Sequence, residues 1–206
     1  ITHDVSEVFK QLTGLGKART LRHLWQAPFT LHSSIIAAIQ AEADAARSGG
    51  KGRIVAKMNS LVEPEVINAL YEASQAGVMI DLIVRGVCTL RPGVTGLSEN
   101  IRVRSIIGRF LEHHRVMYFY AGGKENVYLS SADWMERNFF KRIELAFPIL
   151  DPKLKKRVIT EGLKFYLADN QQGWEMSSVG AYQRRRSARA KPHNAQGELM
   201  VTLGGS

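Results

Sequence analysis

Apolar side chains recur at two different spacings along this chain of 206 residues. Short apolar runs, which are typical of β-strands, alternate with longer stretches whose apolar positions lie three or four residues apart, which is typical of amphipathic helices. We predict helices at 1–12, 31–47, 64–76 and 152–168, and extended segments at 21–27, 53–58, 79–84, 101–107, 116–120, 127–129 and 142–150. This mixture of elements predicts an α/β fold.

The clearest predicted unit is a strand at 53–58, a helix that begins at Pro64, and a second strand at 79–84. A helical crossover of this length requires the two strands to be parallel, with a right-handed connection. Ligands of such sheets bind beyond the carboxyl ends of the strands. Lys57 and Arg85, which stand at those two ends, are therefore candidate ligand-binding residues.

The stretch 108–144 concentrates further polar residues around two predicted strands. His113 precedes the first strand, a glycine pair joins the strands, and a polar loop that contains Asp133 follows the second strand. Because side chains alternate along a strand, His113 and His114 are expected on opposite faces, so that only one of them faces a common site. A histidine at one strand and an aspartate beyond its neighbour would meet at one point.

Composition places the chain among ordinary globular proteins, with 45% hydrophobic residues. The single cysteine, Cys88, excludes an intrachain disulfide and fits a reducing compartment. No apolar run approaches the length of a membrane span. We therefore expect a cytoplasmic protein, free or peripheral at the membrane.

The formal net charge of +9 favours an anionic partner such as nucleic acid, polyphosphate or an acidic lipid surface. The residues beyond Asp169 are polar and basic, and we expect them to be poorly ordered. Five of the cations cluster there: Arg184, Arg185, Arg186, Arg189 and Lys191.

The polar residues of 108–144 resemble the second half-site of the phospholipase-D-like superfamily, in which H-x-K is followed by G-S-x-N. His113 and Arg115 stand at the H-x-K positions, and Ser131 and Asp133 stand at the serine and asparagine. Where the superfamily has an aspartate after H-x-K, this chain has Tyr120. That difference argues against an ordinary phosphodiesterase and for a narrower relative.

Four longer segments, 56–78, 80–102, 109–119 and 127–138, resemble the C-terminal catalytic domain of bacterial polyphosphate kinase. The resemblance implies a phospholipase-D-like α/β domain whose mixed sheet is flanked by helices. It further implies a remnant of the preceding domain at 1–18, the phospholipase-D-like domain at 19–169 and a basic, flexible tail at 170–206.

The resemblance also implies an activity, the reversible transfer of the γ-phosphate of ATP to inorganic polyphosphate. In that family the phosphorylated histidine lies in the preceding domain, and no such element occurs here before residue 56. We therefore expect a fragment that is inactive alone and acts with the missing N-terminal domains, in a protein that forms a homo-oligomer when complete. The Mg²⁺ and adenine ligands would lie mostly outside this chain, and we predict no metal ligand within it.

Individual roles follow from the resemblance. His113 is the predicted catalytic residue, a proton donor or phosphate ligand. Arg85 and Arg142 match phosphate-binding arginines, and Lys57 is a weaker candidate for the same role. Carboxylates often hold an imidazole in one tautomer, and Asp133 and Glu144 are the candidates for that function. For Glu144 the resemblance also implies a second possibility, because its neighbourhood borders the nucleotide in that family.

Two other functions remain open from the sequence. One is a phospholipase-D-like phosphodiesterase that acts on nucleic acid. The other is a non-enzymatic module that binds polyphosphate or nucleic acid. A pure binding module should depend on its basic tail, whereas the kinase hypothesis assigns phosphate binding to Arg85 and Arg142.

Overall fold

A mixed β-sheet forms the centre of the protein in the computed structural model, which describes residues 1–14, 21–184 and 191–204. In the order of the sheet, nine strands lie side by side as β1-β7-β6-β5-β2-β3-β4-β8-β9. The strands are β1 (Trp25–Gln26), β2 (Arg53–Met58), β3 (Met79–Val84), β4 (Ile101–Ile106), β5 (Arg115–Ala121), β6 (Lys124–Ser130), β7 (Leu145–Pro148), β8 (Gly173–Met176) and β9 (Tyr182–Arg184).

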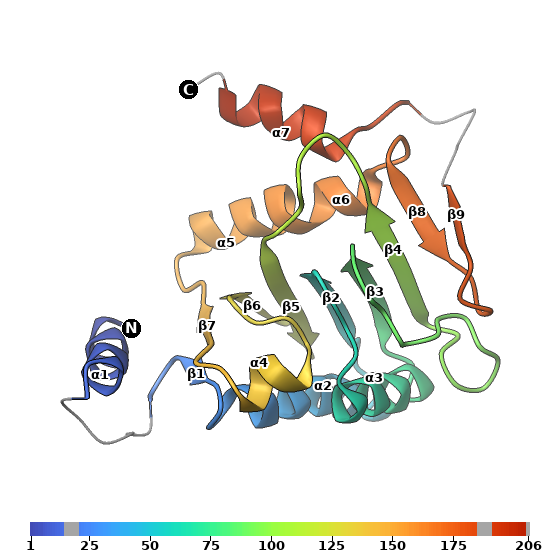
Figure 1. The fold of residues 1–206 in the computed structure, drawn as a ribbon. Coiled ribbons are helices and arrows are strands. Elements are labelled where there is room, and N and C mark those ends of the chain that lie inside the picture. Colours follow the sequence, from blue (N-terminus) through green and yellow to red (C-terminus); the bar gives the residue numbers. More distant parts are fainter. Residues whose placement is uncertain (15–20, 185–190, 205–206) are drawn as a thin grey trace.

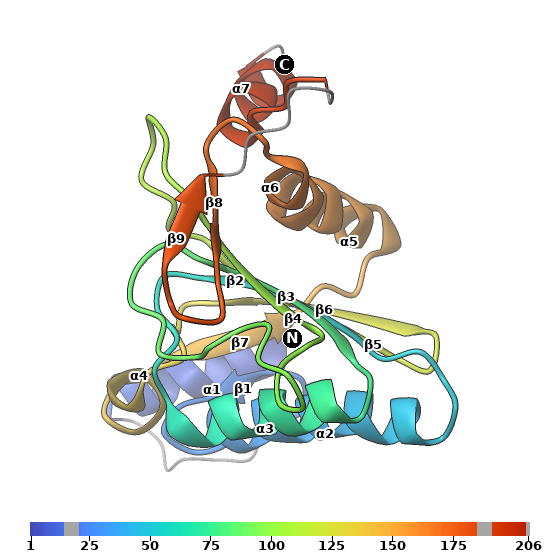
Figure 2. The same cartoon turned by 90° about the vertical axis from the view of Figure 1, so that its right-hand side faces the viewer.

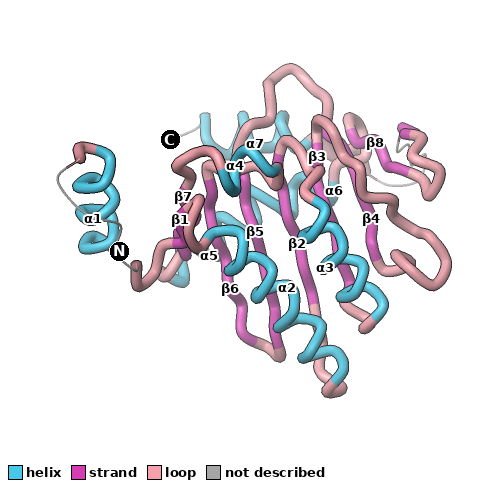
Figure 3. Tube along the Cα trace, turned by 60° about the horizontal axis from the view of Figure 1, so that its bottom comes forward, coloured by secondary structure: helices cyan, strands magenta, loops and turns pink. Residues whose placement is uncertain are grey.

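Helices flank the sheet on both faces, as the sequence predicts (Figures 1 and 2). The helices are α1 (Thr2–Leu12), α2 (Leu31–Arg47), α3 (Pro64–Gln75), α4 (Glu136–Phe140), α5 (Pro152–Ile159), α6 (Phe165–Ala168) and α7 (Ala195–Gly204), and a π-helical turn, η1 (Thr160–Lys164), joins α5 to α6. Figure 3 shows α2 and α3 lying across one face of the central strands. Figure 2 shows α5 and α6 over the other face, with α7 beyond them. None of the helices in the described ranges is long and apolar enough to cross a membrane.

The predicted β-α-β unit is confirmed, with β2, β3 and β4 parallel to one another. Helix α3 begins at Pro64, directly after Glu63, whose buried carboxylate accepts hydrogen bonds from the backbone of Glu65 and Val66. A side-chain acceptor before the helix and a proline at its first position are both favourable, because the first backbone N–H groups have no partner within a helix. Alternating side chains of β2 bury Ile54 towards the α2–α3 layer and Val55 towards α5 and α6.

The strand–turn–strand prediction is also confirmed, and β5 pairs with β6 along its whole length. The connecting glycines, Gly122 and Gly123, have φ angles of 61° and 102°. Only glycine adopts such angles readily, so this pair produces the tight reversal. On its other side β5 runs antiparallel to β2, and the start of β5 therefore lies beside the carboxyl end of β2.

Two predicted extended segments are much shorter in the structure. Segment 21–27 retains only Trp25–Gln26 as a strand, and segment 142–150 retains only Leu145–Pro148. The short helix α4, which the hydrophobic pattern did not predict, ends at Phe140 and leaves Arg142 in a bend before β7. Arg142 therefore does not open a strand.

The prediction of a poorly ordered tail beyond Asp169 is wrong for the residues that the structure describes. Strand β8 adds to the free edge of β4, and β9 pairs with β8. The buried carboxylate of Asp169 accepts hydrogen bonds from three backbone N–H groups, those of Gln171 at 2.9 Å, Gln172 at 2.7 Å and Ala195 at 2.8 Å. An edge strand offers unpaired backbone groups, and these contacts order a segment whose basic composition suggested a flexible arm. Arg185, Arg186 and Arg189 lie outside the described residues.

The substitution Asp169→Ala should destabilise the chain because it leaves three buried backbone donors without an acceptor. We expect a loss of about 3 kcal/mol in the free energy of unfolding, measured by urea denaturation. The matched control is Asp44→Ala, which removes a carboxylate that is 72% exposed in a surface pair with Arg47. A loss no greater than that of the control would show that Asp169 does not anchor this segment.

Candidate functional site

One edge of the sheet collects the polar residues that the sequence singles out. The carboxyl ends of β2 and β3 lie at this edge, and so does the start of β5, because Lys57 of β2 pairs with Val116. Arg115 in turn pairs with Ser130, the last residue of β6. The H-x-R triplet, the loop after β6 and the ends of two parallel strands therefore converge, as predicted.

Asp133 lies at the centre of this edge, buried to 7% exposure. Its Oδ1 accepts hydrogen bonds from the backbone N–H of Asn59 at 2.7 Å and from Nε of Arg115 at 3.1 Å. Its Oδ2 accepts from Nη2 of Arg115 at 3.0 Å. Burial raises the pKa of Asp133, but the hydrogen bonds from Arg115 and Asn59 outweigh it and hold the pKa below its usual value. The carboxylate is therefore ionised at neutral pH and orients the guanidinium of Arg115.

Arg115 also contacts the predicted catalytic histidine. Its Nη1 lies 3.3 Å from Nδ1 of His113 and 3.3 Å from the backbone oxygen of His113. A guanidinium has only donors, so Nδ1 must be the acceptor, and a neutral His113 carries its proton on Nε2. The imidazole is exposed, and its Nε2–H is available to donate to a ligand.

Arg85 joins the same network through Asn59. Its Nε donates to Oδ1 of Asn59 at 2.7 Å, and Nδ2 of Asn59 donates to Oδ2 of Asp133 at 3.3 Å. The structure shows no hydrogen bond from the two terminal guanidinium nitrogens of Arg85 to any described residue. A fixed guanidinium whose two terminal nitrogens still carry four N–H donors suits an oxygen-rich anion such as phosphate.

Lys57 faces the layer formed by α5 and α6, and its ammonium group already forms an ion pair with Glu112. Its side chain is 3% exposed, its Nζ donates to Glu112 at 2.9 Å, and it lies 4.6 Å from the ring centre of Tyr166. Burial lowers the pKa of Lys57, Glu112 raises it in part, and the charges of Arg85 and Arg115 lower it further. The predicted phosphate contact would require the ammonium to leave its carboxylate partner.

Arg142 and Glu144 lie in the segment that leads into β7. Arg142 is exposed, and within the described ranges it makes no ion pair. The buried carboxylate of Glu144 accepts hydrogen bonds from Nδ2 of Asn138 at 2.6 Å and from the hydroxyl of Ser131. Glu144 therefore fixes the loop that carries Asp133.

Neither predicted carboxylate contacts an imidazole in the described part of the chain. Asp133 binds the guanidinium of Arg115, and Glu144 binds uncharged side chains, so an orienting effect on His113 passes through Arg115. The reason is geometric, since Arg115 lies between the two: its Nε faces Asp133 and its Nη1 faces His113.

His114 turns away from this network, towards α6, and the two histidines do face different environments. Its Nε2 lies 3.3 Å from the backbone oxygen of Gly162, and its ring packs against Tyr166 with the centres 5.2 Å apart. Burial and the charge of Lys57 lower the pKa of His114 to about 4. It is neutral at pH 7, and its contacts are those of a packing residue.

No role was predicted for three residues that the structure places in or beneath this network, namely Asn59, Glu112 and Gln196. Asn59 directly follows the predicted strand 53–58, so a local signal existed for it. Glu112 and Gln196 had none, because they are 84 residues apart in the chain and meet only in the fold.

The site residues do not form a metal centre. No three His, Cys, Asp or Glu side chains gather to hold an ion among the residues that the structure places. Asp133 is the carboxylate at the centre of the site that could bind a metal ion, but both of its oxygens already accept hydrogen bonds from Asn59 and Arg115.

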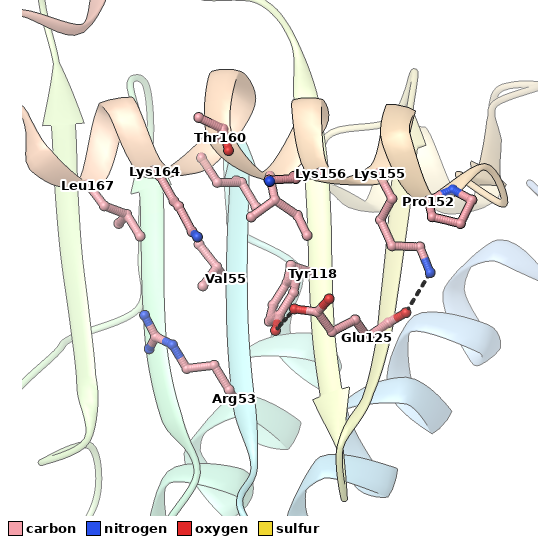
Figure 4. Close-up of a pocket in the computed structure, with 12 residues that line it drawn as sticks. Arg53, Val55, Tyr118, Glu125, Pro152, Lys155, Lys156, Thr160, Lys164 and Leu167 are labelled. Atoms are coloured by element: carbon pink, nitrogen blue, oxygen red, sulfur yellow. Dashed lines mark hydrogen bonds between the residues drawn. The ribbon is translucent and has the colours of Figure 1, made fainter.

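A separate cavity of about 550 Å³ lies between α5–α6 and the sheet (Figure 4). Arg53, Tyr118 and Lys164 line it, and Tyr118 donates a hydrogen bond to Glu125 across its floor. It includes neither His113, Arg85 nor Asp133. The candidate site is instead the open edge of the sheet.

The family model described as polyphosphate kinase C-terminal domain 2 matches residues 24–196 of this chain. The chain belongs to this family. The match extends through β8 to the start of α7, so it includes most of the segment that the sequence analysis assigned to a tail.

Two curated relatives show how this domain relates to longer proteins. A polyphosphate kinase of Paraburkholderia phytofirmans is 64% identical over 200 residues, and one of Burkholderia cenocepacia is 66% identical over 201 residues. These alignments cover 97% and 98% of this chain but only 29% of each relative. The polyphosphate kinase domain therefore spans less than a third of the length of the curated relatives that it matches.

Solved structures agree with the fold. The crystal structure of polyphosphate kinase from Porphyromonas gingivalis superposes with a TM-score of 0.94 at 39% identity and covers 98% of this chain and 31% of that one. A phospholipase D family member, Nuc from Salmonella typhimurium, superposes with a TM-score of 0.54 at 17% identity, over 75% of this chain and 97% of that one. The second likeness shows the fold alone. The predicted phospholipase-D-like fold class is confirmed.

The network around Asp133 predicts a pH-dependent stability. Because its pKa is lowered in the folded state, ionised Asp133 stabilises the fold above its unfolded pKa of about 3.9. That stabilisation is lost as the pH falls through the lower, folded value. Asp133→Asn, which presents an N–H₂ group to Arg115, should cost about 3 kcal/mol at pH 7, and the difference from the original chain should shrink below pH 4.

Urea unfolding at pH 7, 5 and 3 would measure both effects. Asp44→Asn, at the exposed end of α2, is the matched control. A difference between the original chain and Asp133→Asn that stays constant across this pH range would contradict the assigned role of the carboxylate.

Proposed function

We propose that this domain is the C-terminal catalytic part of a polyphosphate kinase that reversibly transfers the γ-phosphate of ATP to inorganic polyphosphate. The observation that carries the proposal is the arrangement at the sheet edge. There Asp133 fixes Arg115, Arg115 leaves the Nε2–H of His113 directed outwards, and Asn59 holds Arg85 beside them. Fixed cations and one proton donor at an open edge are what phosphoryl transfer requires from a protein, since positioning and charge supply most of the catalysis.

In the proposed mechanism the nucleophile is a histidine of the missing N-terminal domains. Its ring nitrogen forms a bond to the γ-phosphorus while the bond from phosphorus to the bridging oxygen of ADP breaks. A terminal oxygen of polyphosphate then attacks the phosphohistidine, and the same steps in reverse regenerate ATP. This fragment alone would be inactive, because it lacks the nucleophile.

The residues of this chain would hold the phosphates during both steps. The guanidinium groups of Arg85 and Arg142 bind the equatorial oxygens, where negative charge accumulates. Nε2–H of His113 donates to the leaving or bridging oxygen. Mg²⁺, when bound, would neutralise charge on the phosphate oxygens. Its ligands would be those phosphates and the missing domains, because the described residues offer no ligand cluster.

Exposed apolar side chains around the site support docking of the missing domains. Val87, Ile107 and Leu111 follow β3 and β4 or precede β5, and they are 61%, 63% and 74% exposed. A cluster of exposed apolar residues is typical of a surface that another domain covers. We infer that the N-terminal domains of the same enzyme pack here in a cytoplasmic homo-oligomer, either free or peripheral at the membrane.

The substitution His113→Ala in the full-length enzyme tests the catalytic assignment. We expect turnover to fall by about 100-fold or more, which is the usual contribution of a general acid. The thermal midpoint should stay unchanged, because His113 is exposed and bonded only to Arg115 within the described residues. His23→Ala, at another exposed histidine, is the control. Near-normal turnover of His113→Ala would refute the role.

Phosphate binding by this chain can be measured by calorimetric titration with tripolyphosphate. Arg85→Ala should weaken the affinity by about 10-fold or more, because a charge-assisted hydrogen bond to phosphate is lost. Arg47→Ala, which removes an exposed arginine of α2 that pairs with Asp44, is the matched control. An affinity that survives in the Arg85→Ala/Arg142→Ala double variant would assign binding to the basic segment 184–191 and favour the non-enzymatic module.

A further inference from the structure

The loop that carries His113 has no regular secondary structure of its own. Residues 107–114 connect the end of β4 to the start of β5 and contain neither helix nor strand. Phe110 and Leu111 are 48% and 74% exposed, whereas Glu112 is buried to 7%. The position of His113 therefore depends on what Glu112 and the backbone of this loop bind.

Glu112 connects the loop to the sheet on one side and to the C-terminal helix on the other. Its Oε2 accepts a hydrogen bond from Nζ of Lys57 in β2 at 2.9 Å. Its Oε1 accepts from Nε2 of Gln196 in α7 at 2.6 Å. Burial raises the pKa of Glu112, but the charge of Lys57 and the hydrogen bonds from Gln196 and Lys57 outweigh it and lower the pKa. The carboxylate stays ionised beneath the site.

Gln196 also binds the backbone of the loop in both directions. The N–H of Phe110 donates to Oε1 of Gln196 at 3.0 Å, and Nε2 of Gln196 donates to the carbonyl oxygen of Phe110 at 2.8 Å. These contacts require one acceptor, for the N–H of Phe110, and two N–H donors, for the carbonyl oxygen of Phe110 and for Glu112. A primary amide provides this combination. A glutamate at this position would place a second carboxylate against Glu112, and a methionine would fill the volume without any hydrogen bond.

The position of Gln196 is itself fixed by its surroundings. Gln196 is buried to 5% and follows Ala195, which is fully buried and whose N–H donates to Asp169 at 2.8 Å. At Gly108, at the other end of the loop, an added Cβ would collide with the amide oxygens of Gln172 and Gln196. The loop therefore has glycine where the side chains of Gln172 and Gln196 both come close.

We propose that Gln196 is a positioning residue for the reaction. Through the backbone of Phe110 and the carboxylate of Glu112, it holds the 107–114 loop on the sheet and so sets the direction in which His113 presents Nε2–H. This inference rests on the catalytic role proposed above for His113. It assigns to the C-terminal helix a part in the site, although the described hydrogen bonds of the Gln196 side chain go to Phe110 and Glu112 and not to His113.

Steady-state kinetics of the full-length enzyme test the proposal. Gln196→Met should lower kcat by about 10- to 100-fold, since a displacement of about 1 Å can have an effect of that size, while KM for ATP changes little. Gln196→Glu should be impaired at least as strongly. Glu198→Gln, an exposed position on the same helix, is the matched control and should behave as the original enzyme.

A double-mutant comparison separates positioning from general destabilisation. If Gln196 acts through His113, Gln196→Met should have no further effect on kcat in the His113→Ala background. An equal fold-loss in both backgrounds, or unchanged kcat of the single variant, overturns the proposal.

Hydrogen exchange provides a readout that does not depend on activity. In Gln196→Met the amide proton of Phe110 should exchange faster, because it loses its acceptor, while amides of β2 and β3 keep their protection. Unchanged exchange at Phe110 overturns the proposal whatever the kinetics show. If His113→Ala retains activity but Phe110 exchange increases in Gln196→Met, the catalytic role of His113 fails and the anchoring of the loop stands.

Discussion

The hydrogen bonds of one buried carboxylate, Asp133, determine how the candidate site is assembled. Asp133 follows β6, its partner Asn59 follows β2, and its partner Arg115 begins β5, so a single side chain joins three strands at their ends. An ionised group is stable at such a depth only when its oxygens are paired. The requirement to pair Asp133 therefore places Arg115, and through it His113, at one point on the sheet edge.

The same physics explains why so many cations can gather there. Arg85 and Arg115 lie close enough to Lys57 that their positive charges lower its pKa. The carboxylate of Asp133 neutralises the charge of Arg115, and that of Glu112 neutralises the charge of Lys57. Arg85 binds the uncharged Asn59 through Nε, so its terminal N–H groups stay available for a ligand. A cluster with a positive surplus on a rigid frame attracts phosphate at little cost of reorganisation, and this preorganisation is the main electrostatic resource of a phosphotransferase.

The C-terminal segment extends this frame to the second side of the site. Strand β8 covers the edge of β4, Asp169 fixes the start of α7, and Gln196 reaches the loop before β5. Its role was hidden by its composition, because a run of arginines is typical of a solvated arm. The hydrogen bonds that order the segment connect residues far apart in the chain, which composition does not describe.

The sequence by itself determined the strands and helices of the central unit, the turn at Gly122-Gly123, and the convergence of His113, Arg115 and Asp133. These depend on local periodicity, on backbone angles that only glycine adopts readily, and on the antiparallel hairpin, in which the start of one strand lies beside the end of the next. Only the tertiary structure decided that Lys57 pairs with Glu112, that Glu144 binds Ser131 and Asn138, and that Gln196 holds the loop of His113. Partners separated by 55 and 84 residues leave no local pattern, because a buried charge or amide is satisfied by whichever group the fold brings within about 3 Å.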